Sequence, residues 1–348
     1  MITTLISAIA IKATLSPRTA PMSDFEHSAE VRVMRVFDGK LYVGGRFERA
    51  NRKLANNIAV WDGTAWSTLG KGVDGPVHDI CAIGKDIYVC GEFSYANKGK
   101  NDEGTPANRV AKWDGTKWSA LAARVVDREI FALATDGKNL YLGGNFQKIN
   151  DTTETRSVAK YDGTKITAMG GQFDRGVMNM AWFNGKLYVG GIFKENGDDE
   201  CLNTAVWDGK AWAEVPGMPS SCYRMRTDGK DLYAAPSAGN VYKLDGAKWS
   251  KVVETSGQVF GLHIEEGKLY LGGDFTKVNG KETHQLAIVD GKNVTTIPEI
   301  RYARHIAMIP FGGAFIIGGV YGDVQGADYL GGMLKWDGKK EIDALTKD

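Results

Sequence analysis

The stretch LYVGG at Leu41–Gly45, followed by WDG at Trp61–Gly63, decides the fold, because both strings recur along the chain in strict alternation. The first string returns with variations, seven times in all, beginning at Leu41, Ile87, Leu140, Leu187, Leu232, Leu269 and Phe315. The second string also occurs seven times, beginning at Trp61, Trp113, Tyr161, Trp207, Leu244, Val289 and Trp336. Self-similarity at a period of about 20 to 50 residues is typical of a repeat architecture.

Each repeat carries two turn signals. Asp38-Gly39 and its equivalents precede the first string, and Asp62-Gly63 and its equivalents lie inside the second. Asp-Gly and Asn-Gly between apolar runs predict β-hairpins whose loop residues need positive φ. Two hairpins make four antiparallel strands per repeat, and 315 residues from Val31 to Leu345 give 45 residues for each of seven repeats. The sequence therefore predicts an all-β protein with a single seven-bladed β-propeller over residues 31–345.

The even repeat with no linker argues against two separate β domains. Because the first strand of the first repeat and the last strand of the last repeat are both present, we expect the ring to close without a shared strand. Val31–Phe37 and Glu341–Leu345 should then lie in different blades.

The composition excludes several classes of protein. The chain has 348 residues, 43% apolar and 24% charged, as in ordinary globular proteins. Its 43 Lys and Arg nearly balance 42 Asp and Glu, so no net field attracts nucleic acid or an anionic membrane. No apolar run approaches the roughly 18 residues of a membrane helix. We therefore expect no nucleic-acid partner and no membrane insertion.

Residues 1–30 differ from the rest of the chain. Ile2–Leu15 is apolar with Ser and Thr mixed in, but no cation precedes it and Lys12 interrupts it, so it fits a secretory signal poorly. We interpret residues 1–30 as an N-terminal arm and linker that could dock as an extra strand, with a signal peptide as the alternative.

The repeats resemble bacterial and phage-type propeller repeats of the LYVGG-x-F … WDG-x-x-W pattern, related in style to kelch repeats and to the central domain of galactose oxidase. The resemblance covers Val31–Leu345 and implies the propeller fold. The galactose oxidase resemblance would also imply a copper site of Tyr, Cys and His, and no matching constellation is present, so no catalytic residue is transferred. Repeat five departs from the pattern, with Ala235-Pro236 in place of the paired glycines.

No catalytic or metal motif accompanies the repeats. The five histidines lack metal-ligand spacing, and no nucleophile elbow or phosphate-binding loop occurs. The acidic run Asp198-Asp199-Glu200 is interpreted as a solvated loop rather than a calcium site. Most tryptophans occupy fixed repeat positions, which favours packing between blades over ligand binding. We expect no cofactor, no metal and no enzymatic activity.

The cysteines leave one disulfide open. Cys201 and Cys222 both belong to the loop face of one blade edge, so an oxidising compartment would allow them to pair.

Function is sought in the loops, because binding residues concentrate there. One face of the predicted ring carries every long loop, namely 48–57, 94–108, 147–156, 194–203 and 276–285. Arginines recur in the connections between repeats, at positions 124, 128, 175, 224, 226, 301 and 304. They could pair with Asp74, Asp127 and Asp174, or bind an anionic ligand or acidic partner at the channel mouth. The candidate binding residues are Arg128, Arg175, Tyr223, Arg301, Tyr302, Arg304 and His305.

These observations predict a non-enzymatic binding or structural module that contacts protein or glycan through its long-loop face. The N-terminal arm favours a subunit of a larger assembly, such as a virion, a tail or a cell-surface complex. One alternative is a secreted stand-alone binding protein, and another is an enzyme with a site at the channel mouth. The expected location is a virion surface, a cell surface or the extracellular space.

Overall fold

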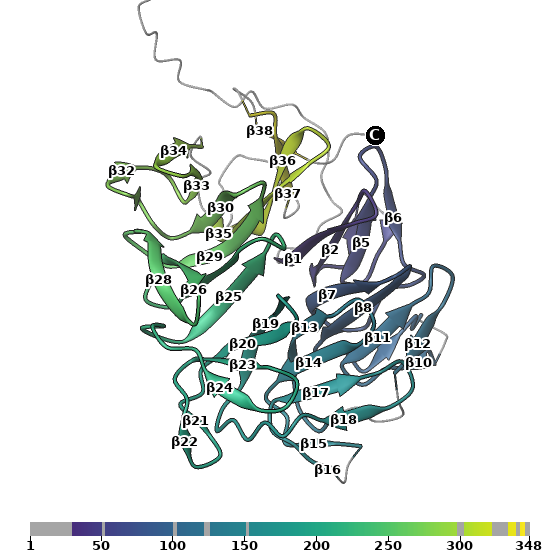
Figure 1. The fold of residues 1–348 in the computed structure, drawn as a ribbon. Coiled ribbons are helices and arrows are strands. Elements are labelled where there is room, and N and C mark those ends of the chain that lie inside the picture. Colours follow the sequence, from purple (N-terminus) through teal and green to yellow (C-terminus); the bar gives the residue numbers. More distant parts are fainter. Residues whose placement is uncertain are drawn as a thin grey trace, which may run out of the picture.

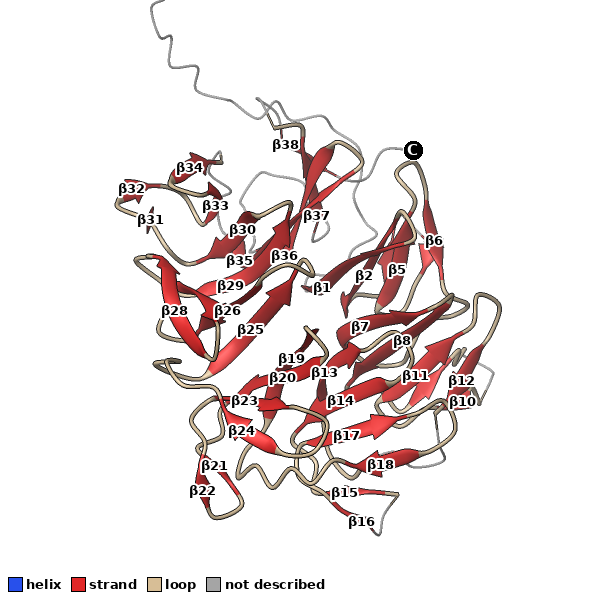
Figure 2. Ribbon diagram, in the orientation of Figure 1, coloured by secondary structure: helices blue, strands red, loops and turns tan. Residues whose placement is uncertain are grey.

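The computed structural model describes residues 30–50, 53–99, 103–121, 126–150, 153–297, 303–321, 333–338 and 342–344. These residues form strands, turns and loops, with no helix among them (Figure 2). The predicted N-terminal arm lies outside the described residues. The protein is an all-β, seven-bladed propeller in which short antiparallel sheets surround a common axis (Figure 1).

Each blade contains four antiparallel strands, which we call inner, second, third and outer, counted from the axis. The inner strands are β1 (Glu30–Phe37), β7 (Val77–Ile83), β13 (Ile130–Thr135), β19 (Val177–Phe183), β25 (Cys222–Thr227), β29 (Val259–Glu265) and β35 (Ala303–Phe311). The second strands are β2 (Lys40–Arg46), β8 (Asp86–Gly91), β14 (Leu140–Gly144), β20 (Lys186–Gly191), β26 (Leu232–Pro236), β30 (Lys268–Gly273) and β36 (Ala314–Tyr321). The third strands are β5 (Ile58–Trp61), β11 (Val110–Trp113), β17 (Val158–Tyr161), β23 (Thr204–Trp207), β27 (Val241–Asp245), β33 (Leu286–Asp290) and β37 (Met333–Trp336). The outer strands are β6 (Trp66–Thr68), β12 (Trp118–Ala120), β18 (Ile166–Ala168), β24 (Trp212–Glu214), β28 (Lys248–Val253), β34 (Asn293–Thr296) and β38 (Ile342–Ala344).

The two recurring strings pair with each other. The first string forms the second strand and WDG ends the third strand, so that Leu41 lies opposite Trp61 and Leu187 opposite Trp207. The same register recurs from blade to blade because the same residues recur, and this confirms the prediction of four strands per repeat.

The turns differ in backbone conformation. Before the first string both loop residues have positive φ, as predicted, in blades 1, 4, 6 and 7, with 49° at Asp38 and 67° at Gly39, whereas in blades 2, 3 and 5 only one glycine does. Inside WDG only the glycine does, with 101° at Gly63. The Asp62 carboxylate instead accepts hydrogen bonds from the backbone N–H groups of Thr64 and Ala65, both at 2.8 Å. This is an Asx-type turn, so the expectation of two positive φ angles is wrong there.

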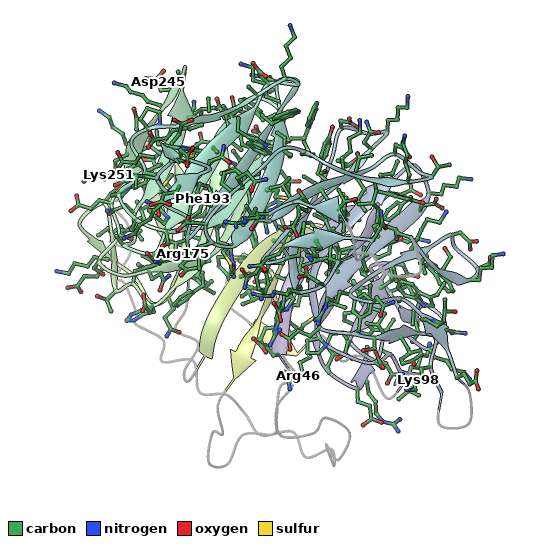
Figure 3. The ribbon with its side chains drawn as sticks, turned by 90° about the horizontal axis from the view of Figure 1, so that it is seen from below. Arg46, Lys98, Arg175, Phe193, Asp245 and Lys251 are labelled. Carbon is green, nitrogen blue, oxygen red and sulfur yellow. The ribbon has the colours of Figure 1, made fainter. Side chains whose placement is uncertain are left out.

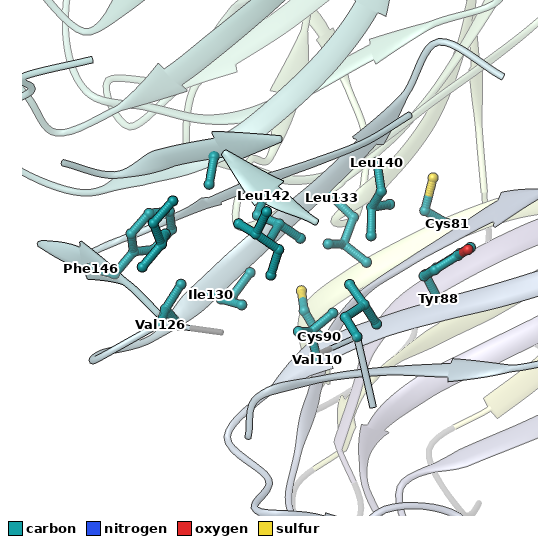
Figure 4. Packing of buried hydrophobic residues seen from close by; sticks show 14 residues of the cluster. Cys81, Tyr88, Cys90, Val110, Val126, Ile130, Leu133, Leu140, Leu142 and Phe146 are labelled. Atoms are coloured by element: carbon teal, nitrogen blue, oxygen red, sulfur yellow. The ribbon is translucent and has the colours of Figure 1, made fainter. Parts of the chain in front are cut away.

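The hydrophobic core is divided into seven clusters, each shared by two consecutive blades. The cluster between blades 2 and 3 joins Cys81, Tyr88 and Val110 to Leu133 and Phe146 (Figure 4). No blade buries its apolar faces alone, which is why the repeat needs to form a ring.

Tryptophans at the repeat positions pack between blades, as predicted. Trp118 is buried, and its indole Nε1 donates a 2.7 Å hydrogen bond to the carbonyl oxygen of Leu69 in the preceding blade. Trp212 donates likewise to Met169, at 2.9 Å. The off-register Trp182 stacks on Tyr141 with ring centroids 5.3 Å apart.

The ring closes without a shared strand, which confirms the prediction. β1 pairs with β2 in blade 1, whereas β38 pairs with β37 in blade 7. Among the described residues the two blades are joined by one backbone pair, Glu30 with Val320, and by an apolar cluster that includes Met34 and Ile316. Closure therefore depends on the same side-chain packing as the other blade interfaces.

At each of the paired glycines of the first string, a side chain would collide with a different part of the protein. A Cβ at the first glycine would crowd the next blade, as at Gly190, where Cys222 Sγ would be 2.7 Å away. A Cβ at the second glycine would collide with backbone of its own inner strand; at Gly144 the obstacle is the carbonyl group of Glu129. Blade 5 carries Pro236 at the second position, and its connection to the third strand lacks the additional hairpin found in five other blades.

Candidate functional site

The two faces of the ring are built differently. Five of the predicted long loops contain a short hairpin: β3 (Arg49–Ala50) with β4 (Lys53–Leu54), β9 (Tyr95–Ala96) with β10 (Thr105–Pro106), β15 (Lys148–Ile149) with β16 (Thr153–Glu154), β21 (Glu195–Asn196) with β22 (Asp199–Glu200), and β31 (Lys277–Val278) with β32 (Lys281–Glu282). Figure 3 shows Arg46 and Lys98 on this long-loop face and Asp245, in a tight turn, on the opposite side. The sequence predicted the loops but not their hairpins, because two-residue strands carry no periodicity.

Four of the five hairpins are fixed at their base by a side chain at an equivalent position. The Asp74 carboxylate accepts hydrogen bonds from the N–H groups of Ser94 and Tyr95, both at 2.8 Å. Asp127 and Asp174 do the same in the next two blades, and the Ser256 hydroxyl takes this role in blade 6. The main partners of these aspartates are therefore backbone N–H groups of the loops. The sequence had suggested that they pair with the arginines, and that pairing is the weaker of the two roles.

Removing the Asp127 side chain should loosen β15–β16 while leaving the ring folded. Burial raises the pKa of Asp127, but hydrogen bonds from the N–H groups of Gln147 and Lys148 outweigh burial and lower it overall. A lowered carboxyl pKa means that the stabilisation is complete above the unfolded value of about 4 and is lost as the pH falls through the folded pKa. We expect Asp127→Ala to cost about 1–2 kcal/mol.

The measurement is the amide NMR shift of Lys148 between pH 6 and pH 2. The wild-type shift should titrate below pH 4, and the Asp127→Ala shift should not. The Lys277 amide, which bonds the non-titrating Ser256 hydroxyl, is the internal control and should stay constant. A Lys148 shift insensitive to both pH and mutation contradicts the proposed fixing role.

The structure describes the side chains of only three of the predicted site residues. Arg128 and Arg175 are exposed and precede the inner strands of blades 3 and 4; Arg175 Nε lies 3.5 Å from Asp174 Oδ2, whereas Arg128 forms no ion pair with a described carboxylate. Tyr223 is partly exposed on β25. Arg304 and His305 lie on β35, but their side chains, like Arg301 and Tyr302 entirely, are outside the described residues. Within the described ranges no contact joins these residues into one site.

The disulfide that the sequence left open between Cys201 and Cys222 is not formed. All four cysteines are free and buried. Cys201 packs in the cluster between blades 3 and 4, and Cys222 in the cluster between blades 4 and 5. The two thiols therefore belong to different blade interfaces, not to one edge.

Each inner strand has a bulge, after which side chains alternate. In blade 1 the bulge lies between Val31 and Val33, and similar register shifts occur in all other blades. On each inner strand, we call the residue that pairs with the first glycine of the string the first axial position. The residue two positions later on the same strand is the second axial position. The first positions are Val33, Asp79, Ala132, Asn179, Arg224, Gly261 and Ala307. The second positions are Arg35, Cys81, Ala134, Ala181, Arg226, His263 and Ile309.

The polar residues of these positions form what we call the axial cluster: Arg35, Asp79, Asn179, Arg224, Arg226 and His263. Arg35 Nη2 donates a 2.6 Å hydrogen bond to Asp79 Oδ1, and Asp79 Oδ2 accepts one from the N–H of Leu133 at 3.1 Å. These bonds connect blades 1, 2 and 3.

Arg224 and Arg226, predicted in a connection, lie instead on the inner strand β25. Arg224 Nε donates to the carbonyl oxygen of Phe260 at 2.6 Å, and Arg226 Nη1 donates to that of Met225 at 2.7 Å. A longer contact of 3.4 Å links Arg226 to the Asn179 amide oxygen. Their guanidinium groups therefore bond mainly to backbone carbonyls rather than to carboxylates.

The pKa values of residues in the axial cluster are shifted by charged residues of the cluster that belong to other blades. Loss of hydration lowers the pKa of Arg226 well below its usual value, and the charges of Arg35 and Arg224 lower it further, against an opposing effect of Asp79. Burial, Arg226 and Arg35 together lower the pKa of His263 to about 4, so this imidazole is neutral at pH 7. Arg35 belongs to blade 1 and Arg226 to blade 5, so the charges can interact only near the axis.

A second group of charges lies where the inner strands begin. Arg32 contacts Glu30 at 3.0 Å and Glu92 at 3.1 Å, and His78 lies 3.0 Å from Glu92. Burial and the Arg32 charge lower the pKa of His78. Carboxylates outnumber arginines in this group, two to one, which is the opposite of the axial cluster.

Sequence reasoning missed Arg35 and Asp79 and misplaced Arg224 and Arg226. One feature of the sequence could have placed Arg35 and Arg226 at equivalent positions of the inner strands. Arg35 lies six residues before Leu41, the start of the first string in blade 1, and Arg226 lies six residues before Leu232, its start in blade 5. Neither residue stands in a recognisable motif, because four of the other five blades carry Cys, Ala or Ile at this position and the fifth carries His263.

The described residues place no three His, Cys, Asp or Glu side chains so that they could hold a metal ion. Over the same ranges no helix is long and apolar enough to span a membrane.

Fold and axial geometry together define the chain as a seven-bladed β-propeller. No family model and no curated protein matches it. Solved propeller structures do resemble it. The extracellular domain of BT4673 from B. thetaiotaomicron matches 87% of this chain at 10% identity and a TM-score of 0.55, and this chain spans only 39% of that longer one. The WD40 β-propeller domain of Doa1 matches 84% of this chain and 90% of its own length, at 12% identity and a TM-score of 0.53. The β-propeller domain of the Trilobed protease from Pyrococcus furiosus, which has an open velcro topology, matches 92% of this chain and 98% of its own length, at 15% identity and a TM-score of 0.51. At such identities the likeness concerns the fold.

Proposed function

We propose that this protein is a non-enzymatic binding module that contacts a protein or glycan through its long-loop face. The observation that carries the proposal is the recurring, fixed hairpin. Four of the hairpins share the same side-chain attachment to the backbone at their base, while the sequences of their tips differ. Variable tips on a rigid repeating frame are the usual construction of a binding surface.

The similar structures support the coarser part of this proposal. One is an extracellular domain and another is a WD40 domain. In more detail, we propose that the protein is displayed on a virion, a tail or a cell surface, with residues 1–30 as a docking arm. We also propose that its repeats are related to kelch-like repeats. Secretion as a stand-alone binding protein and catalysis at a site in the channel mouth are the alternatives.

Cross-linking in the native source tests which face binds. Lys98, Lys148, Lys194 and Lys277 report on the long-loop face, while Lys117, Lys165 and Lys210 report on the tight turns. Intermolecular cross-links should concentrate on the first set. Cross-links confined to the second set would refute the assignment, and a glycan array run in parallel covers the non-protein partner.

Charge reversal on the long-loop face should weaken binding of the identified partner without destabilising the fold. We expect at least a tenfold loss of affinity for the double variant Arg128→Glu, Arg175→Glu, because both side chains are exposed at the base of the hairpins. The matched control is Lys117→Glu, Lys165→Glu, two exposed cations in tight turns of the opposite face. Equal effects of the two double variants would contradict a specific role for the long-loop face.

A further inference from the structure

The axial positions carry an excess of positive charge. Among their fourteen residues are three arginines and a single carboxylate, Asp79. His263 adds no charge at neutral pH, because its pKa is about 4. Asp79 is already bound to Arg35 at 2.6 Å. Arg224 and Arg226 form no ion pair within the described part of the chain.

The arginines also keep unused donors. Arg224 engages Nε and Nη1, and Arg226 engages Nη1. Over the described ranges, no acceptor bonds Nη2 of either residue or Nε of Arg226. Both residues are only partly exposed, so bulk water screens these charges less than it would screen surface arginines.

The other axial positions are apolar or lack a side chain. Ala132, Ala134, Ala181, Gly261 and Ala307 are short, and Val33, Cys81 and Ile309 are larger. Many of these side chains pack in the clusters between blades, so the polar groups at the axial positions are those of the axial cluster itself.

We propose that the axial cluster binds a small oxyanion with two negative charges, a phosphate or a dicarboxylate, through Arg35, Arg224 and Arg226. Two charges match the excess of three arginines over one aspartate. Guanidinium groups bind the oxygens of carboxylates and phosphates in pairs of parallel hydrogen bonds. This site is separate from the long-loop face, so either proposal can fail without the other.

Isothermal titration calorimetry at constant ionic strength tests the proposal on the full chain. Inorganic phosphate and succinate are the two ligands, and sodium chloride is the blank. At least one dianion should bind saturably near one equivalent per chain, and the comparison of the two separates phosphate from dicarboxylate chemistry. No saturable heat from either ligand overturns the proposal.

Variants locate the site. Arg226→Gln should weaken binding at least tenfold, whereas Lys165→Gln, at an exposed cation in a tight turn of the opposite face, should leave it unchanged. The reverse order of effects, or no effect of Arg226→Gln, overturns the assignment.

If Arg226→Gln fails to fold, wild-type crystals soaked in selenate decide the question. Anomalous density between Arg35 and Arg226 supports the site, and density confined to surface arginines rejects it.

Discussion

Replacing Gly144 by alanine should destabilise the propeller by about 3 kcal/mol, because the new methyl group would meet backbone rather than side chains. A Cβ there would collide with the Glu129 carbonyl oxygen and lie 3.0 Å from Ile130 Cα. Glu129 immediately precedes the inner strand β13 and Ile130 begins it; this strand packs against the inner strands β7 and β19 of the two neighbouring blades and so cannot move aside.

Urea denaturation followed by tryptophan fluorescence measures the loss. Gly176→Ala is the matched control, because a Cβ there finds nothing closer than 3.5 Å and its φ is not in the left-handed region. We expect the control to change the free energy of unfolding by less than about 1 kcal/mol. Similar losses for the two variants would show that the close approach in the second strand is not what requires glycine.

Replacing Asp79 by leucine should cost about 3–5 kcal/mol, because it removes the one carboxylate of the axial cluster and leaves Arg35 without its partner. The Asp79 side chain is only 6% exposed. It also accepts the N–H of Leu133, which would lose its acceptor in the variant.

A double-mutant cycle separates the ion pair from the rest of this loss. Adding Arg35→Met to Asp79→Leu should recover about 2 kcal/mol or more, because it removes the unpaired charge. Additive free energies of unfolding would show that Asp79 acts through the backbone N–H alone, and that Arg35 does not depend on it.

The fold could be predicted from the sequence because similar residues recur at the equivalent strands and turns of each repeat. The Leu and Tyr of the first string, the Trp of WDG and the Asp-Gly turns set strand, register and turn in each blade. The Asx turn at Asp62 escaped prediction because the same dipeptide serves two turn types, and only the side-chain hydrogen bonds distinguish them.

The candidate site could not be predicted in the same way, since a binding site departs from the repeat. Arg35 and Arg226 stand at a position where other blades have Cys81, Ala134 and Ala181, so no recurring pattern marks them. Their proximity follows only from closing the ring. The recurring Asp127 and Asp174 were noticed in the sequence, but their partners are backbone N–H groups, which have no signature in it.

The junction of blades 7 and 1 differs from the other six in one respect. Every other pair of neighbouring blades is also tied by the continuous chain, whereas here a single backbone pair, Glu30 with Val320, supplements the apolar contacts. A partial opening that separates these two blades stretches no chain connection between them; among the described residues it breaks one backbone pair and loses one side-chain cluster of seven. The junction is thus the natural place for the ring to widen, and an opening there would admit solutes to the axis sideways, between two blades, as well as from either end.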